Sequence, residues 1–166
     1  MDYDKAARFW VEKDKEGKRA PDAKAKLLAF LASHKVCALA TGSGSFVRCT
    51  PLEYAFLDGA FWIFSEGGLK YRGLKDNKEV SLAVFDVPEG NAFGHLHSAQ
   101  ISAKAEIVEP FSPEYLKLLG YKHIPEIAVR KMAEPIHLIK IVPLAADYLD
   151  SDFKKEGFDS RQSVRF

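Results

Sequence analysis

The chain has 166 residues, of which 47% are hydrophobic and 28% charged, and its formal net charge is +1. A chain of this size buries roughly 70% of its unfolded surface, so residues 1–166 are expected to form one domain with a self-sufficient core. The balanced charge argues against a nucleic-acid groove or a polybasic membrane surface. The opening residues show no signal-peptide pattern, and no apolar run is long enough to span a bilayer, so we expect a cytoplasmic protein.

The first 34 residues show helical patterns. Tyr3 and Ala6 stand at helical spacing, and a polar run around Gly17 interrupts the pattern. A second amphipathic stripe, which includes Leu27 and Leu31, is expected to cover a sheet. Residues 2–34 are therefore predicted to form N-terminal helices that precede a barrel core of residues 35–142.

Strand patterns begin with the apolar run at residues 36–41. The link Gly42–Ser45 leads into residues 46–57, where side chains alternate with the period of two that is typical of a strand. Asp58-Gly59 between apolar runs is a strong hairpin signal, because both turn positions need positive φ. We therefore predict one hairpin over residues 46–65, with Arg48 and Thr50 on the same face.

The hairpin is followed by features that suit an anion. Glu66-Gly67-Gly68 turns the chain after Ser65, and residues 69–75 have helical spacing with Lys70 in the first turn. Helix starts carry free N–H donors and partial positive charge, and Lys70 and Arg48 would add two full cations. This pattern predicts a phosphate site; the alternative is an ordinary turn with solvated surface cations.

The second half of the chain continues the strand pattern with short helical interruptions. We predict strands at residues 80–87, 95–109 and 136–142, a helix at 113–119 and a helical turn at 125–132. Residues 143–166 are predicted to be a C-terminal tail, whose charged part after residue 150 is either a small helix or an arm on another surface. About six strands joined mostly by close turns indicate a mainly β fold, an antiparallel β-barrel with peripheral α-helices.

Cysteine and histidine give little evidence of a metal. Cys37 and Cys49 match neither metal-ligand spacing nor a disulfide framework, so both are expected in the core. His95 and His97 share a strand face but have no third ligand at a convincing spacing, which favours structural or pocket-rim roles over a metal. The other three histidines, His34, His123 and His137, carry no recognisable signal.

The order of these motifs resembles the pyridoxamine 5'-phosphate oxidase-like FMN-binding split barrels, and within them the nitroimidazole-reductase-like branch. The resemblance covers roughly residues 35–110: a strand arginine, an Asp-Gly hairpin, Ser65 at a strand end, Lys70, the run from Leu74 to Asn77 and the strand around Ile101. It implies an FMN-binding split β-barrel that forms a homodimer, with the cofactor at the interface.

The resemblance also implies a set of cofactor-binding residues. The FMN phosphate would lie at Lys70 and Arg48, and Gln100 and Ser102 would reach the cofactor from the partner subunit. The flavin ring, ribityl chain and phosphate would be lined by a strand run and a strand-end pair, namely Cys49, Thr50, Pro51, Leu52, Phe64 and Ser65.

The implied function is an FMN-dependent oxidoreductase that passes electrons to a small acceptor, with a nicotinamide as a candidate donor and no evident catalytic acid-base pair. Two departures argue against oxidation of pyridoxamine phosphate itself: Leu69 stands where many oxidases have a second cation, and the ending DSRQSVRF lacks a recognisable substrate-binding arginine segment. Two alternatives stay open: a flavin- or haem-binding protein without turnover, for which a histidine at the pocket rim would be diagnostic, and a deazaflavin-dependent reductase.

Overall fold

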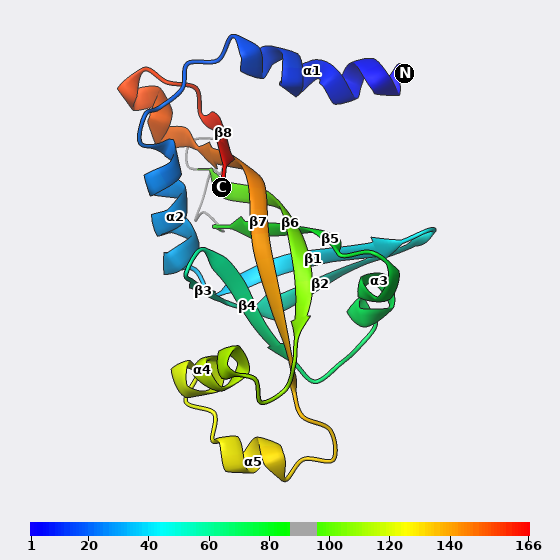
Figure 1. Ribbon diagram of the computed structural model, residues 1–166. Coiled ribbons are helices and arrows are strands. Elements are labelled where there is room, and N and C mark those ends of the chain that lie inside the picture. The colour runs from blue at the N-terminus through cyan, green and yellow to red at the C-terminus, as the bar shows by residue number, and fades with distance from the viewer. Residues whose placement is uncertain (87–95) are drawn as a thin grey trace.

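The computed structural model describes residues 1–86 and 96–166 and forms a curled antiparallel sheet flanked by helices (Figure 1). The strands run in the spatial order β2-β1-β5-β6-β7-β4-β3, and β8 pairs with β7. Their bounds are β1 Val36–Ser43, β2 Phe46–Glu53, β3 Ala55–Leu57, β4 Ala60–Ser65, β5 Glu79–Phe85, β6 His97–Val108, β7 His137–Asp150 and β8 Arg161–Arg165. The predicted mainly β, barrel-type fold is confirmed.

Helices lie around this sheet. They are α1 Tyr3–Lys15, α2 Ala23–Ser33, α3 Lys70–Asp76, α4 Pro113–Tyr121 and α5 Glu126–Arg130, and a 3-10 helix follows β7 over Ser151–Glu156. The α2 helix buries its apolar stripe in the core, as predicted, whereas α1, at the top of Figure 1, buries no residue and contacts the sheet near β8 through Trp10 and Asp14. Among the described residues, no helix is long and apolar enough to cross a membrane.

The predicted hairpin over residues 46–65 is wrong in its extent. β2 pairs along its whole length with β1, whereas the Asp58-Gly59 turn joins only the short β3 to β4. The change of partner occurs at Tyr54, whose N–H donates to Lys35 O at 2.7 Å and whose hydroxyl donates to Leu31 O at 2.8 Å. This buried tyrosine ties the chain to the junction of α2 and β1, so the strand cannot run on unbroken.

The predicted end of a strand at residue 142 is also wrong, because β7 continues through Pro143 to Asp150. Pro143 lies at an irregularity: its partner on β6 is Ala103, whereas the adjacent Ser102 pairs with Ala145. An irregularity of this kind tolerates a residue without an N–H donor. The chain then returns as β8, so the charged tail contributes both a 3-10 helix and a strand of the sheet.

Two clusters of buried side chains form the core. The larger lies between the sheet and α2 and includes Leu27, Leu39 and Ile101, and the smaller packs under α4 around Trp62 and Tyr115. Cys37 is buried as expected, but Cys49 is exposed. The core position predicted for Cys49 is wrong because β2 is the last strand on its side of the sheet and this side chain faces away from the core.

Candidate cofactor site

An open cavity of about 690 Å³ lies where β4 ends and the chain turns towards α3. Ser65 closes this turn, because its hydroxyl donates to Gly67 O and accepts from Gly67 N–H, both at 3.2 Å. Gly67 and Gly68 have φ of 140° and 104°, which glycine adopts without strain. A cavity of this size suits a small-molecule cofactor. Its lining residues are Leu52, Phe64, Ser65, Glu66, Gly67, Gly68 and Ile136.

Lys70 is a buried cation beside this cavity. Lys70 is only 5% exposed, and its Nζ donates a hydrogen bond to Gly67 O. It forms no ion pair with residues 1–86 or 96–166, and burial lowers the pKa of its amine below 10.5. Since a buried charge is costly unless it is paired, this position favours an anionic ligand. The seven-residue α3 is short, so the lysine rather than a helix dipole carries the positive charge.

Close packing of α3 on β1 fixes the position of Lys70. A Cβ atom on Gly73 would lie 2.9 Å from Gly42 N and 3.0 Å from Thr41 Cβ, so only glycine lets the helix approach this closely. Asn77 at the end of the helix donates from Nδ2 to Gly42 O at 2.9 Å. Lys70 therefore starts a helix that is held to the sheet at two points.

Three residues near the cavity had no signal in the sequence. The rings of Tyr71 and His137 lie 5.1 Å apart, and His137 pairs with Ser65 across β4 and β7. Burial raises the pKa of the Tyr71 phenol, while the nearby Ser65 hydroxyl acts in the opposite direction. Only the pairing of β4 with β7 brings His137 and Ile136 here, so no local motif could have identified them.

The residues predicted on β2 divide between two faces. Arg48, Thr50 and Leu52 lie opposite Thr41, Leu39 and Cys37 of β1, so they share the side on which α3 packs. Leu52 lines the cavity, and Arg48 is exposed. Cys49 and Pro51 alternate to the other, exposed face. Phe64 and Ser65 line the cavity directly.

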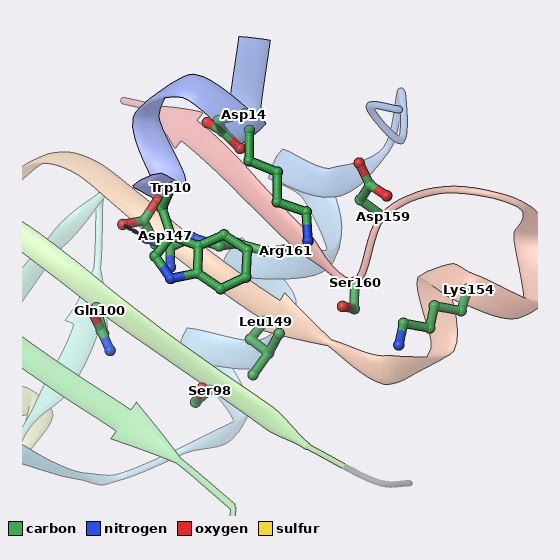
Figure 2. Close-up of a pocket in the computed structure, with 11 residues that line it drawn as sticks. Trp10, Asp14, Ser98, Gln100, Asp147, Leu149, Lys154, Asp159, Ser160 and Arg161 are labelled. Carbon is green, nitrogen blue, oxygen red and sulfur yellow. Dashed lines mark hydrogen bonds and ion pairs between the residues drawn. The ribbon is translucent and has the colours of Figure 1, made fainter. Parts of the chain in front are cut away.

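Gln100 and Ser102 do not reach this cavity within one chain. Gln100 lines a second cavity of about 350 Å³ on the outer side of β6 and β7 (Figure 2), and both residues line a third of about 240 Å³. The second cavity is closed by α1, whose Trp10 ring lies 4.9 Å from the Arg161 guanidinium. Arg161 is in turn paired with Asp147 at 2.6 Å. Of the predicted residues, Leu52, Phe64 and Ser65 therefore line the first cavity, whereas Gln100 and Ser102 lie at other cavities.

Comparisons with known proteins agree with this fold. The family model described as pyridoxamine 5'-phosphate oxidase matches residues 23–150. A search of curated protein sequences found no significant match.

Several solved structures are similar at low sequence identity. ChuZ from Campylobacter jejuni has a TM-score of 0.67 at 15% identity and covers 99% of this chain and 69% of its own. An FAD-binding protein from Mesorhizobium loti has a TM-score of 0.61 at 19% identity, covering 75% and 90%. A heme-binding protein from Mycobacterium smegmatis has a TM-score of 0.65 at 15% identity, covering 88% and 59%. At these identities the likeness concerns the fold alone.

Proposed function

The chain belongs to the pyridoxamine 5'-phosphate oxidase family, and from that premise we propose that it is an FMN-binding oxidoreductase that passes electrons to a small acceptor. The observation that carries the proposal is Lys70, a buried cation that lies beside an open cavity and has no ion pair within the described part of the chain. A flavin phosphate is an anion of the kind that would satisfy it. The narrower placement in the nitroimidazole-reductase-like branch is part of the proposal.

The residues around the cavity fit such a cofactor. Lys70 would hold the phosphate beside the Gly67-Gly68 turn, and Arg48 would add a second cation from β2. Each charge-assisted hydrogen bond contributes about 1.5–3 kcal/mol, so a few of them retain a phosphate compound at micromolar concentration. Leu52 and Phe64 offer apolar surface beside this anion position. The negative charge of Glu66, which lines the cavity, would repel a bound phosphate. The positive charge of Arg48 would offset this repulsion.

The bound flavin would supply the redox chemistry, while the protein supplies position and electrostatics. Oxidation of pyridoxamine phosphate itself is not part of the proposal. Leu69 precedes Lys70 in place of a second cation, and Arg161 of the last strand is occupied by Asp147 and Trp10. The acceptor and the electron donor, for which a nicotinamide is a candidate, must be identified by assay.

A second candidate, a haem-binding protein without turnover, is favoured by one observation. His137 lies beside Tyr71 and pairs with Ser65, which lines the cavity, so its imidazole would be the candidate ligand for haem iron. The similarity to a heme-binding protein from Mycobacterium smegmatis adds the fold alone. Haem and flavin would be distinguished at once by their absorbance.

The deciding experiment is the absorbance spectrum of protein purified without added cofactor, followed by heat release and mass identification of the bound compound. Released FMN supports the proposal and directs the next assays to electron acceptors. A haem band that is lost in His137→Ala moves the second candidate to first place. A colourless protein that takes up a deazaflavin but not FMN indicates a deazaflavin-dependent reductase, and one that takes up none of these cofactors refutes the proposal.

A further inference from the structure

At the opposite end of β7 from His137, three neighbouring strands bring an acid, a histidine and an acid into one row. His97 at the start of β6 pairs with Asp150 at the end of β7. Asp86 follows the last residue of β5, and its N–H donates to His97 O at 3.0 Å. The row therefore rests on backbone pairing across the sheet, which holds the three side chains in register.

The histidine ring lies between the two carboxylates. His97 Nε2 is 3.2 Å from Asp150 Oδ1, and His97 Nδ1 is 3.4 Å from Asp86 Oδ2. The other oxygen of Asp86 is 2.7 Å from His34 Nε2 at the end of α2. Asp152 of the 3-10 helix adds a third carboxylate, so one ligand atom each from His97, Asp150 and Asp152 lies within 4.8 Å of the others.

We infer that His97, Asp150 and Asp152 form a binding site for a divalent transition-metal ion, for which Zn²⁺ is the best match. One imidazole nitrogen with carboxylate oxygens is a donor set that Zn²⁺ accepts. Asp150 is only 8% exposed, and a buried carboxylate of this kind is stabilised by a neighbouring cation. The site is separate from the proposed flavin cavity and involves none of its lining residues.

The surroundings of His97 supply what a metal-binding histidine requires. Such a histidine usually donates its second ring N–H to a carboxylate, which fixes the tautomer and the ring orientation. Asp86 occupies that place, and it is itself held by His34. At metal–ligand distances of about 2.1 Å, tetrahedral ligands lie roughly 3.4 Å apart. The pair of His97 and Asp150, at 3.2 Å, already has close to this spacing, and Asp152 would complete the site from within 4.8 Å.

Two features explain why sequence spacing gave no sign of this site. His97 is more than fifty residues from Asp150 and Asp152 in the chain, and only the pairing of β6 with β7 brings it to them. His95, the other half of the H-x-H pair, lies outside the described residues and is not needed. The competing explanation is that contacts between the side chains alone hold the row, with the His97 ring between Asp86 and Asp150 and no metal ion. Asp152 also pairs with Lys155 at 2.7 Å, and a metal would have to compete with that contact.

The test uses tag-free, EDTA-treated, full-length protein titrated with Zn²⁺ at pH 7 by calorimetry. We expect about one equivalent to bind with micromolar affinity or better, and His97→Gln and Asp152→Asn each to weaken binding at least tenfold, as is typical when a ligand or its support is lost. Saturating Zn²⁺ should raise the Tm by roughly 5–10 °C at a hundredfold excess over Kd. Co²⁺ should give a visible ligand-field spectrum that His97→Gln changes.

The matched control is His123→Asn, which removes an exposed imidazole at a φ of 55° that asparagine also adopts. This variant should bind Zn²⁺ as the parent protein does. If His97→Gln fails to fold, Asp152→Asn decides, since its side chain lies nearer the surface. Zn²⁺ that binds no better to the parent protein than to either ligand variant, or that leaves the Tm unchanged, would overturn the site and leave the proton-held network as the explanation.

Discussion

At the residue scale, the buried amine of Lys70 makes a prediction that separates ligand binding from stability. Lys70→Ala should weaken FMN by about tenfold or more, which corresponds to ~1.4 kcal/mol, because the cation that contacts the Gly67-Gly68 turn is lost. The ligand-free protein should keep its Tm, since an unpaired buried charge is removed. Fluorescence quenching of FMN on titration measures the affinity.

The control for this prediction is Lys75→Ala, an exposed lysine in the last turn of the same helix. It changes the net charge equally, so an equal loss in both variants would mean that only general electrostatics act. Arg48→Ala should also weaken FMN about tenfold if β2 supplies the second cation. Affinities that stay unchanged in both Lys70→Ala and Arg48→Ala would remove the proposed phosphate site while leaving the fold intact.

The lowered pKa of Lys70 should make both the stability of the ligand-free protein and its affinity for FMN depend on pH. Its folded-state pKa lies below the unfolded value of 10.5, so the ligand-free protein gains stability from this group as the pH rises between the two values. FMN binding needs the charged amine and should therefore weaken over the same rise in pH. Titrations of FMN at increasing alkaline pH should show this loss in the parent protein and not in Lys70→Ala.

The two cysteines should differ sharply in reactivity. Burial, with a smaller contribution from Cys49, raises the pKa of the Cys37 thiol to about 12, whereas Cys49 is exposed on β2. Since the thiolate is the reactive species, iodoacetamide at pH 8 should modify Cys49 alone in the native protein and both thiols in guanidinium. Peptide mass spectrometry identifies which cysteines have been modified. Equal labelling of the two in native protein would contradict the placement of β1 and β2.

At the element scale, the contact between α3 and β1 should be intolerant of a single methyl group. In Gly73→Ala the new Cβ would lie 2.9 Å from a backbone nitrogen, so the helix must shift, and we expect a loss of roughly 1–3 kcal/mol and a fall in Tm of about 2–12 °C. FMN affinity should fall as well, because Lys70 moves with the helix. Thermal unfolding with and without FMN measures both effects.

Gly120→Ala in α4 is the matched control, because nothing lies within 4 Å of its Cβ position. Alanine is the better helix former, so this variant should gain roughly 0.5–1 kcal/mol. If Gly73→Ala behaves like Gly120→Ala, then α3 does not pack on β1 as closely as described, and Lys70 is not fixed by that contact.

The elements also show where sequence reasoning succeeds and where it stops. Period-two alternation correctly placed Arg48 and Leu52 on one face, and the Asp58-Gly59 turn was found because both residues need positive φ. The pairing of β2 with β1 could not be predicted from local sequence. The continuous strand pattern over residues 46–57 is interrupted at Tyr54 by a contact with Leu31 of α2, which is distant in the chain. A proline such as Pro143 predicts a strand end from sequence, because only the pairing with β6 shows the irregularity that accommodates it.

At the scale of the whole molecule, the separation of the predicted residues becomes informative. Lys70 and Ser65 lie at one cavity, whereas Gln100 lies at another, and the two cavities share no lining residue. The resemblance implied both groups, and local sequence patterns carry no information on how two copies of the chain would meet. Both groups can act on one cofactor only if a second copy brings its β6 to the cavity of the first, which is the arrangement that the resemblance implies.

This arrangement makes a strict prediction about oligomeric state. Light scattering should give twice the chain mass of 18.6 kDa for the FMN-loaded protein. Gln100→Ala should weaken FMN although Gln100 does not line the cavity of its own chain, whereas Glu106→Gln, an exposed change farther along β6, should not. A monomer that retains FMN, or an affinity that is independent of Gln100, would refute the shared site.

Mixing two damaged proteins tests the shared site directly. Lys70→Ala and Gln100→Ala, refolded together in equal amounts, should form half of their dimers as mixed pairs by random association. In a two-fold symmetric dimer each mixed pair has one site with both intact residues and one with neither, so about a quarter of all sites should regain the parent affinity. Lys70→Ala mixed with the double variant should regain none. If the first mixture also regains none, Gln100 does not act across an interface, and the cofactor is held by one chain alone.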